Sequence, residues 1–297
     1  MAVPVVGALV HLVGLTAWPG DGTAAAGPIE QAIIGGDDSD PGEYPATGAL
    51  VRGNSFTCTA TLVAPDVVVT AAHCLDGGGW GDLTFTLDAD LTDSIDGRIP
   101  VLASHPHPDF HLQGAEYTRM GRRNDVGVAI LEEPILDVPV ERLDSRAYFD
   151  EVEEVRLTLC GYGRDYWSTP STAGVKRDGT IRVEVSNGWE LQSTDEDPQP
   201  CKGDSGGPLF VPTDEGRLLA GVVSRASGDS AMCDTGAIYT RAAPYVDWIA
   251  DAATDRDEGG CSASGTGGGP CWPALLAGLV FSARRGRRRR STGDPPR

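Results

Sequence analysis

The chain has 297 residues, of which 40% are hydrophobic and 23% charged, with 39 Gly and 21 Pro. This is enough apolar material for a core, so disorder throughout is excluded, and too much Gly and Pro for a helical bundle. Residues 33–251 hold 37 acidic and 16 basic residues, a net charge of -21. This acidic body is a poor partner for the phosphate backbone of a nucleic acid.

The N-terminal segment has the pattern of an export signal. Residues 2–17 are apolar but shorter than the roughly 20 residues of a membrane-spanning helix. Ala24, Ala25 and Ala26 supply a small-residue cleavage site. We assign residues 1–26 to a signal peptide and 27–32 to a short propeptide, with a buried N-terminal strand as the alternative. Export leads to an oxidising compartment, where disulfides form.

The body of the chain has a strand-like pattern. Short runs of Val, Leu, Ile and Thr, bounded by Gly, Pro and Asp, predict strands over residues 59–63, 67–70, 83–87, 127–131, 155–160, 180–185, 218–224 and 237–239. Such spacing indicates an all-β sandwich or a pair of barrels. One helix is predicted over residues 243–252, where Tyr245, Trp248, Ile249 and Ala252 recur at helical spacing.

The sharpest motif is Gly-Asp-Ser-Gly-Gly-Pro at residues 203–208. A serine hydroxyl is a weak nucleophile until a base removes its proton, and flanking glycines let a carbonyl approach the backbone. The same letters fit the Gly-x-Ser-x-Gly turn of α/β-hydrolases, in which the catalytic His follows the Ser. Here all five His precede Ser205, at positions 11, 73, 105, 107 and 111. The base must therefore come before the nucleophile.

The candidate base is His73, in Thr-Ala-Ala-His-Cys at residues 70–74. The candidate orienting acid is Asp125, which opens the apolar run at residues 126–131 and can accept a hydrogen bond from a buried imidazole. Alone, such a His is usually a packed side chain and such an Asp a turn residue. Because both come before the Ser205 motif, they are candidates for the base and the acid that would activate Ser205.

Together the three motifs resemble the chymotrypsin/trypsin family of serine endopeptidases, over residues 33–252. The resemblance implies an all-β fold with two six-stranded antiparallel β-barrels and a short C-terminal helix. It also implies an endopeptidase that hydrolyses protein or peptide substrates through an acyl-enzyme intermediate, with no metal and no cofactor. A protease-fold binding protein without turnover is the alternative.

The resemblance also assigns roles to residues. His73 is the general base, Asp125 fixes its tautomer, and Ser205 is the nucleophile. The backbone amides of Gly203 and Ser205 form the oxyanion hole. The resemblance further implies that cleavage before Ile33 frees an amino group that pairs with Asp204.

The activation site departs from the trypsin pattern. Ile33 follows Ala32, whereas trypsin-type activators cut after Arg or Lys. We expect an activating protease that accepts small residues, the enzyme itself included. The precursor would then be an inactive zymogen.

The family pairing implies disulfides between Cys58 and Cys74 and between Cys201 and Cys233. Cys160 is left as a buried free thiol, a small hydrophobe in its behaviour.

The specificity pocket is assigned by resemblance to Gln199, Pro200, Ser224, Arg225, Ala226 and Ala237. Gln199 stands where the trypsin group has an Asp, so a substrate Arg or Lys would lack a counter-charge. Ala237 stands where Gly is common, so its methyl group shortens the pocket. The sequence therefore predicts small or medium uncharged residues before the cleaved bond.

Two polar clusters allow a metal-binding interpretation. Residues 105–111 hold three His and an Asp, whose spacing is a weak match to transition-metal sites. Residues 88–96 hold four Asp that could bind calcium. Solvated surface segments are the favoured interpretation of both.

The C-terminal end has the order of a sorting signal. A Gly/Ser-rich linker at residues 253–270 leads to a tail at 271–297, with an apolar run followed by seven Arg. This end resembles the myxobacterial C-terminal sorting signal, which implies processing and anchoring at Cys261. We expect an exported protein, secreted or held at the cell surface (outer membrane), with membrane contact only through the tail. An Arg-rich tail that binds nucleic acid and a solvated tail are the alternatives.

Overall fold

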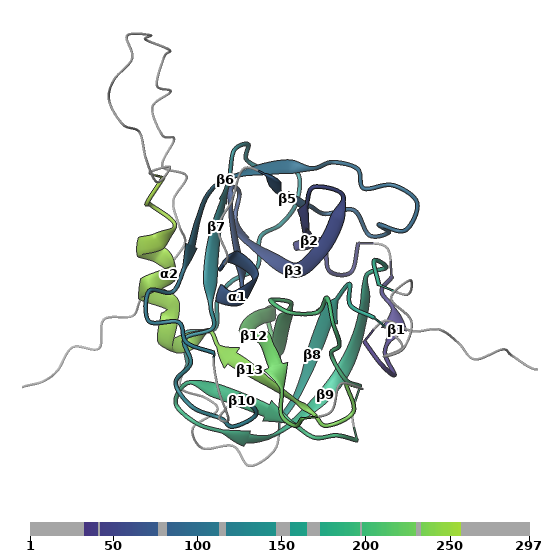
Figure 1. Cartoon of the computed structure of the whole chain (residues 1–297), viewed down its shortest axis with the longest axis vertical. Helices are drawn as coiled ribbons and strands as arrows, with labels where there is room; N and C mark the ends of the chain where they lie inside the picture. Colours follow the sequence, from purple (N-terminus) through teal and green to yellow (C-terminus); the bar gives the residue numbers. More distant parts are fainter. Residues whose placement is uncertain are drawn as a thin grey trace, which may run out of the picture.

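The computed structural model describes residues 33–40, 42–76, 82–112, 117–146, 155–164, 173–196, 198–229 and 233–256. The predicted signal peptide, propeptide and C-terminal sorting tail lie outside the described residues, as does Cys261. The described part folds into strands with little helix (Figure 1). No helix within it is long and apolar enough to cross a membrane.

The first barrel is built from the N-terminal half of the described chain. Its strands are antiparallel and close in the order β2 (Thr47–Arg52), β3 (Ser55–Ala64), β4 (Val67–Thr70), β7 (Gly127–Leu131), β6 (Ile99–Pro106) and β5 (Leu83–Thr86). A short helix, α1 (Ala72–Leu75), follows β4 at the end of the barrel that faces the second half of the molecule (Figure 1).

The second barrel is built from the C-terminal half. Its strands close in the order β8 (Val155–Gly161), β9 (Arg177–Ser186), β10 (Glu190–Ser193), β13 (Ala237–Arg241), β12 (Gly216–Ala226) and β11 (Pro208–Thr213). The two-residue strand β1 (Asp37–Asp38) pairs with the edge of β9. The predicted fold class, two six-stranded antiparallel barrels, is confirmed.

The eight predicted strand segments all fall in or across observed strands, whereas β1, β2, β6, β10 and β11 were not predicted. Prolines explain two of these omissions, because β6 contains Pro100 and Pro106 and β11 contains Pro208 and Pro212. Proline is tolerated near strand ends and at edges, where no ladder hydrogen bond is lost.

The predicted helix over residues 243–252 needs a correction. The structure has a 3₁₀ turn, Ala243–Tyr245, followed by α2 (Val246–Ala252). Pro244 has no backbone N–H and is accommodated in the first turn. The α-helix is therefore one turn shorter than the periodicity suggested.

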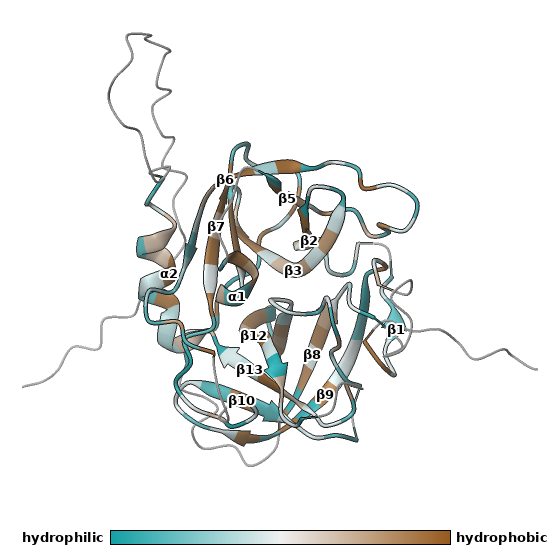
Figure 2. Ribbon diagram, viewed as in Figure 1, coloured by the Kyte–Doolittle hydropathy of each residue, from teal (hydrophilic) through white to brown (hydrophobic). Residues whose placement is uncertain are grey.

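Three of the four apolar clusters in the described part of the chain hold the barrels together, and Figure 2 shows apolar residues concentrated on the strands and on α1. Leu50, Leu62 and Phe85 belong to the cluster inside the first barrel, and Leu157 and Ile181 to that inside the second. A third cluster joins the barrels to each other and to α2, with members Val69, Val128, Phe210, Val222, Tyr245 and Ile249. Packing between the barrels fixes the ends of β4, β7 and β12 relative to one another, which is where the predicted site residues lie.

Candidate active site

Asp125 lies two residues before the start of β7 and is completely buried. The chain bends just before it, because Asn124 adopts φ 54°, a left-handed conformation that Asn tolerates better than most residues. The Asn124 side chain holds the bend: its amide donates to Asp109 O at 2.9 Å and its oxygen accepts from the Tyr245 hydroxyl at 3.0 Å. Asp125 is thus aimed into the junction between the barrels.

His73 lies on α1, directly after β4. Thr70 at the end of β4 pairs with Gly127 at the start of β7, which brings His73 beside Asp125. A Cβ at Gly127 would lie 2.7 Å from Leu75 Cδ1, so glycine lets α1 pack here without a shift of the Leu75 side chain. Strand register therefore brings the two residues together.

The carboxylate of Asp125 accepts hydrogen bonds from both the backbone and the ring of His73. The His73 backbone N–H donates to Oδ1 at 3.0 Å, and ring Nδ1 lies 2.9 Å from Oδ2 and 3.2 Å from Oδ1. From the second barrel, the Ser224 hydroxyl donates to Oδ2 at 2.6 Å. With Nδ1 held by the carboxylate, ring Nε2 is left as the basic nitrogen.

The environment of His73 shifts its titration. Burial by itself lowers the pKa of the imidazole, but the negative charge of Asp125 and its hydrogen bond raise it, and the net result is a pKa above the usual 6.5. The ring keeps a partly exposed edge, since 28% of the side-chain surface is accessible. His73 can therefore exchange a proton with a bound molecule.

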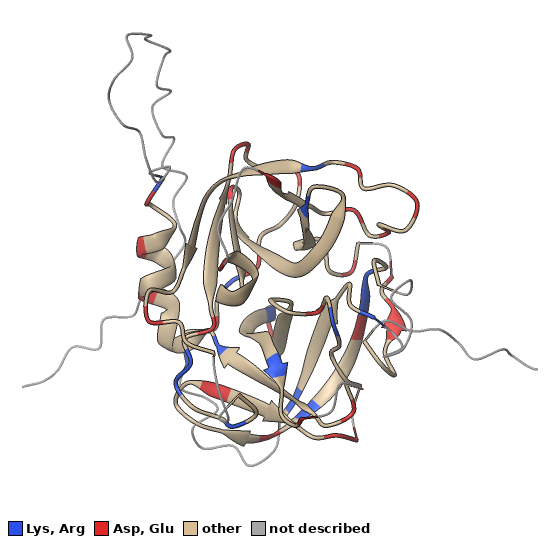
Figure 3. Cartoon of the chain, viewed as in Figure 1, with Lys and Arg blue, Asp and Glu red and all other residues tan. Residues whose placement is uncertain are grey.

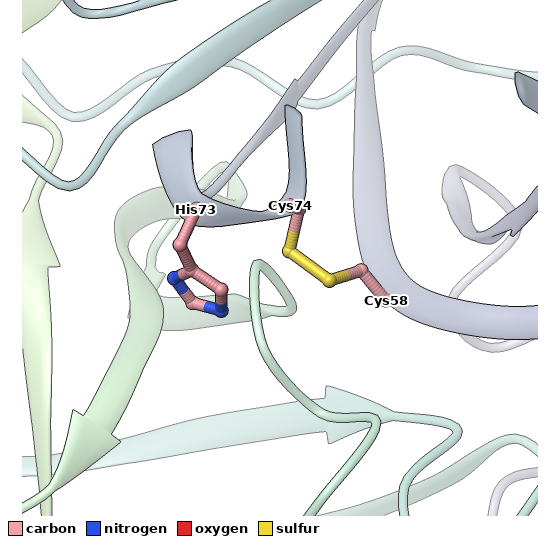
Figure 4. A group of neighbouring side chains, drawn as sticks. All are labelled: Cys58, His73 and Cys74. Carbon is pink, nitrogen blue, oxygen red and sulfur yellow. A yellow bond between two sulfur atoms is a disulfide. The ribbon is translucent and has the colours of Figure 1, made fainter. Parts of the chain in front are cut away.

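A disulfide lies beside His73 (Figure 4). Cys58 on β3 and Cys74 on α1 are bonded at 2.03 Å, so the helix that carries His73 is covalently tied to the neighbouring strand. The sulfur atoms and the imidazole lie within 4.8 Å of one another, as metal ligands would. Sulfurs bonded to each other are not thiolates, so this cluster does not offer a thiolate site.

Ser205 lies in the loop between Cys201 and β11, and both barrels hold this loop. Thr59 of β3 donates its backbone N–H to Ser205 O at 2.9 Å and its hydroxyl to Gly203 O at 3.0 Å. On the other side, the Gly206 N–H donates to Val223 O of β12 at 2.8 Å. The loop is fixed at the junction, and Ser205 and His73 line the same pocket.

The backbone around Ser205 leaves two amides available. Gly203 has φ +108°, and a Cβ there would lie 2.6 Å from the Phe56 ring, so glycine is required. Among the described residues, no acceptor is bonded to the N–H of Gly203 or of Ser205. Two free amides beside a hydroxyl are the arrangement that stabilises a developing oxyanion.

Asp204, next to Ser205, is also completely buried. Its carboxylate accepts hydrogen bonds from the N–H of Gly163 at 2.7 Å and the N–H of Cys201 at 2.8 Å. Burial outweighs these bonds and raises the pKa of the carboxyl group to about 7. Ile33 is buried too, and the next residue, Ile34, forms a two-way backbone bridge with Gln199 at 2.9 Å. Ile33 and the loop that carries Asp204 therefore both pack against the second barrel.

The pocket between the barrels has a volume of about 370 Å³. Five of the six residues assigned to the specificity pocket line it: Pro200, Ser224, Arg225, Ala226 and Ala237. The sixth, Gln199, is not among the lining residues. Its side chain is buried, and its amide donates to Thr194 O at 2.8 Å. The disulfide between Cys201 and Cys233, bonded at 2.08 Å, forms part of the wall.

Several features of the site were not predicted. Tyr117, Lys202 and Asp229 also line the pocket. Ser224 was expected in the pocket wall, but its hydroxyl also bonds Asp125. No local sequence pattern predicts the contact between Ser224 and Asp125, because it joins residues 99 positions apart.

The two polar clusters considered for metals have other partners. His105 Nε2 lies 2.7 Å from Asp255 O, and His107 packs its ring 4.7 Å from that of Trp248. His111 Nδ1 lies 2.9 Å from Asp109 O. The three imidazoles thus face different neighbours. In the acidic segment, Asp88, Asp90 and Asp96 form loop hydrogen bonds with one another and with Thr92.

The fifth cysteine of the described residues, Cys160, is a free thiol on β8, and it is buried. Burial raises the pKa of this thiol to about 12. It remains a neutral apolar group at ordinary pH.

Comparison with known proteins agrees with this geometry. Residues 33–249 match the trypsin family. The chain is 29% identical over 237 residues to a trypsin of Saccharopolyspora erythraea, covering 72% of this chain and 95% of that one. It is 29% identical to human granzyme M, covering 73% of this chain and 87% of granzyme M. With human kallikrein-8 the identity is 26%, over 78% and 89% of the two chains.

The match extends over most of this chain and nearly the whole length of these proteases. The fold, the two disulfides and the three-motif order agree with it. The chain therefore belongs to the trypsin family and is a serine-type endopeptidase.

Proposed function

We propose that the enzyme hydrolyses peptide bonds through His73, Asp125 and Ser205. His73 Nε2 removes the proton of the Ser205 hydroxyl as Oγ attacks the peptide carbonyl. The N–H groups of Gly203 and Ser205 hold the resulting oxyanion, and His73 then gives its proton to the leaving amine. Water, activated by the same imidazole, hydrolyses the acyl-enzyme and returns Ser205 to its starting state.

The observation that carries this proposal is the bonding of Asp125. A buried carboxylate with both its oxygens near His73 Nδ1 fixes one ring orientation and one tautomer. It also stabilises the imidazolium that forms during attack. The pocket that His73 and Ser205 share then supplies the space for a substrate carbonyl.

We further propose that the active enzyme begins at Ile33. The new amino group would pair with the Asp204 carboxylate, which is buried and, within the described part of the chain, accepts hydrogen bonds from two backbone amides. Pairing would hold the loop of Gly203 and Ser205 in the geometry of an oxyanion hole. Because Ala32 precedes the cut, the activating protease would accept a small residue.

We propose export and sorting from the sequence pattern of the two ends. The signal at residues 1–26 would direct export, and the tail at 271–297, with Cys261 before it, would hold the enzyme at the cell surface until it is processed. The two disulfides support this proposal, because such bonds persist in oxidising compartments.

The first prediction tests the nucleophile. A fluorophosphonate should label the trimmed enzyme at Ser205, and Ser205→Ala should abolish both labelling and peptide hydrolysis. Cys160→Ala, a change at a buried residue outside the pocket, serves as the matched control and should keep both. Binding of peptides without labelling or turnover would favour a protease-fold binding protein.

The second prediction concerns pH. Because the pKa of His73 is raised, kcat/KM for a peptide amide should increase with pH along a curve whose midpoint lies above 6.5. Asp125→Asn removes the charge that raises this pKa, so the midpoint should fall, and the rate should fall by about 1000-fold or more. A midpoint that Asp125→Asn leaves in place would contradict the proposed pairing.

The third prediction concerns Asp204. A group with a raised folded pKa contributes stability that is present below its unfolded pKa and lost as the pH rises through the folded value. The uncut chain should therefore lose several degrees of Tm between about pH 4 and pH 7 through Asp204, at about 1.4 kcal/mol per pKa unit.

A chain that begins at Ile33 should not show this loss, because its amino group neutralises Asp204. Thermal unfolding of both forms, each carrying Ser205→Ala to prevent self-cleavage, measures the difference. Asp204→Asn in the uncut chain is the control and should flatten the pH dependence. Equal slopes for cut and uncut chains would rule out the pairing.

The fourth prediction concerns the residue before the cleaved bond. The pocket wall contains Ala226 and Ala237 and presents no carboxylate from position 199, so cleavage after small or medium uncharged residues is expected. Digestion of a proteome-derived peptide mixture, read by mass spectrometry, measures this preference. A profile dominated by Arg or Lys would show that Asp229, the carboxylate that does line the pocket, sets the specificity instead.

A further inference from the structure

A buried ion pair includes Arg225, one of the residues that line the substrate pocket. Arg225 on β12 and Glu190 on β10 have side chains that are 0% and 1% exposed, and Arg225 Nη1 lies 2.8 Å from Glu190 Oε1. Their strands flank β13, with which both pair. In Figure 3, β12 carries a basic segment and β10 an acidic one within this barrel. The pair lies in the interior, and the Arg225 charge is not presented to a substrate.

The five N–H donors of Arg225 are all used. Two bond the Glu190 carboxylate, at 2.8 and 3.0 Å, and one bonds the Ser224 hydroxyl at 3.1 Å. The other two reach across to a separate segment: Nε donates to Tyr117 O at 2.6 Å and Nη2 to Arg119 O at 2.8 Å. A guanidinium with every donor satisfied by fixed acceptors holds its neighbours in one geometry.

Glu190 holds the same segment from the other side. Its Oε2 accepts the backbone N–H of Gly121 at 2.6 Å while it is bonded to Arg225. Residues 117–121 contain no helix or strand, so these three backbone bonds supply much of their anchorage. The Tyr117 side chain is 42% exposed and lines the pocket together with His73 and Ser205. The ion pair therefore fixes one side of the cleft from behind.

We propose that Arg225 and Glu190 are positioning residues for substrate recognition. They hold residues 117–121 so that Tyr117 forms a fixed wall for the acyl portion of the peptide, on the N-terminal side of the cleaved bond. This proposal rests on the proposed function of the pocket as the substrate site. It gives the buried Arg225 a role, because its donors anchor a backbone segment, which an apolar side chain cannot do.

The chemistry of the wall indicates the substrates that depend on it. Tyr117 offers a half-exposed aromatic face, and a peptide side chain that is apolar or aromatic gains most from burial against such a face. Ordering the wall in advance removes an entropic cost from binding, so its effect appears mainly in KM for long peptides. A substrate with only one residue before the cleaved bond does not reach the wall and gains nothing from it.

The test compares two substrates in variants made in the chain beginning at Ile33. One is a single-residue ester, and the other is a peptide amide with Leu at the residues before the same P1 residue. Replacing only Arg225 would strand a buried charge, so the main variant is Arg225→Met with Glu190→Met. Arg217→Met with Glu141→Met is the control, because that pair is also bonded at 2.8 Å and Arg217 also lies on β12, but neither residue lines the pocket. Tyr117→Ala, at an exposed residue, removes the wall without touching the pair.

We expect the Arg225/Glu190 double variant and Tyr117→Ala to lose at least tenfold in kcat/KM for the peptide, mostly through KM. The losses in ester hydrolysis and in the rate of Ser205 labelling should be at least threefold smaller than the loss on the peptide. The Arg217/Glu141 control should keep both activities.

Two results would overturn the proposal. One is an equal loss on ester and peptide in Tyr117→Ala. This variant tests the role of the Tyr117 side chain even if the double variant does not fold. The other is an unchanged KM for the peptide in both variants. A parent enzyme that neither labels nor cleaves either substrate would instead refute the proposed function, and the positioning role with it.

Discussion

The burial of the Asp125 carboxylate is the constraint on which the rest of the site depends. An ionised carboxylate with no accessible surface is tolerated only when hydrogen-bond donors surround it. Two of its donors come from His73, in the first barrel, and one from Ser224, in the second. The carboxylate that orients His73 therefore also bonds the second barrel, so the orientation of His73 depends on how the two barrels pack. The negative charge of this carboxylate and its hydrogen bond to the ring outweigh the burial of His73 and raise the pKa of the imidazole.

Three buried charged groups near the junction are stabilised in different ways. Arg225 and Glu190 neutralise each other and use their remaining hydrogen-bonding capacity on backbone groups. Asp204 accepts hydrogen bonds from two backbone amides, which do not offset its burial, and its pKa is raised to about 7. The first arrangement is complete and suits a rigid support. The second is incomplete, which suits a group that awaits a cation.

Apart from Ala32 at the predicted activation site, the differences from the trypsin pattern occur at residues assigned to the specificity pocket. Gln199 is turned toward a backbone carbonyl, Ala237 adds a methyl group to the pocket wall, and Arg225 is directed inward. The residues that hold His73 and Asp125 together follow the family motifs. The framework for catalysis and the surface for recognition are thus separable in this chain, because the first depends on a few buried bonds and the second on wall residues.

The sequence by itself determined the fold class, the order of base and nucleophile, and the glycines that Ser205 needs, because strand periodicity and turn chemistry are local and motif order is read directly. Only the tertiary structure decided that Ser224 bonds Asp125, that Arg225 pairs with Glu190, and that Tyr117 reaches the pocket. The structure also shows that the C-terminal α-helix begins at Val246, about one turn later than predicted. These contacts depend on how the sheets close and which strands become neighbours, and that register is set by packing of the whole barrel.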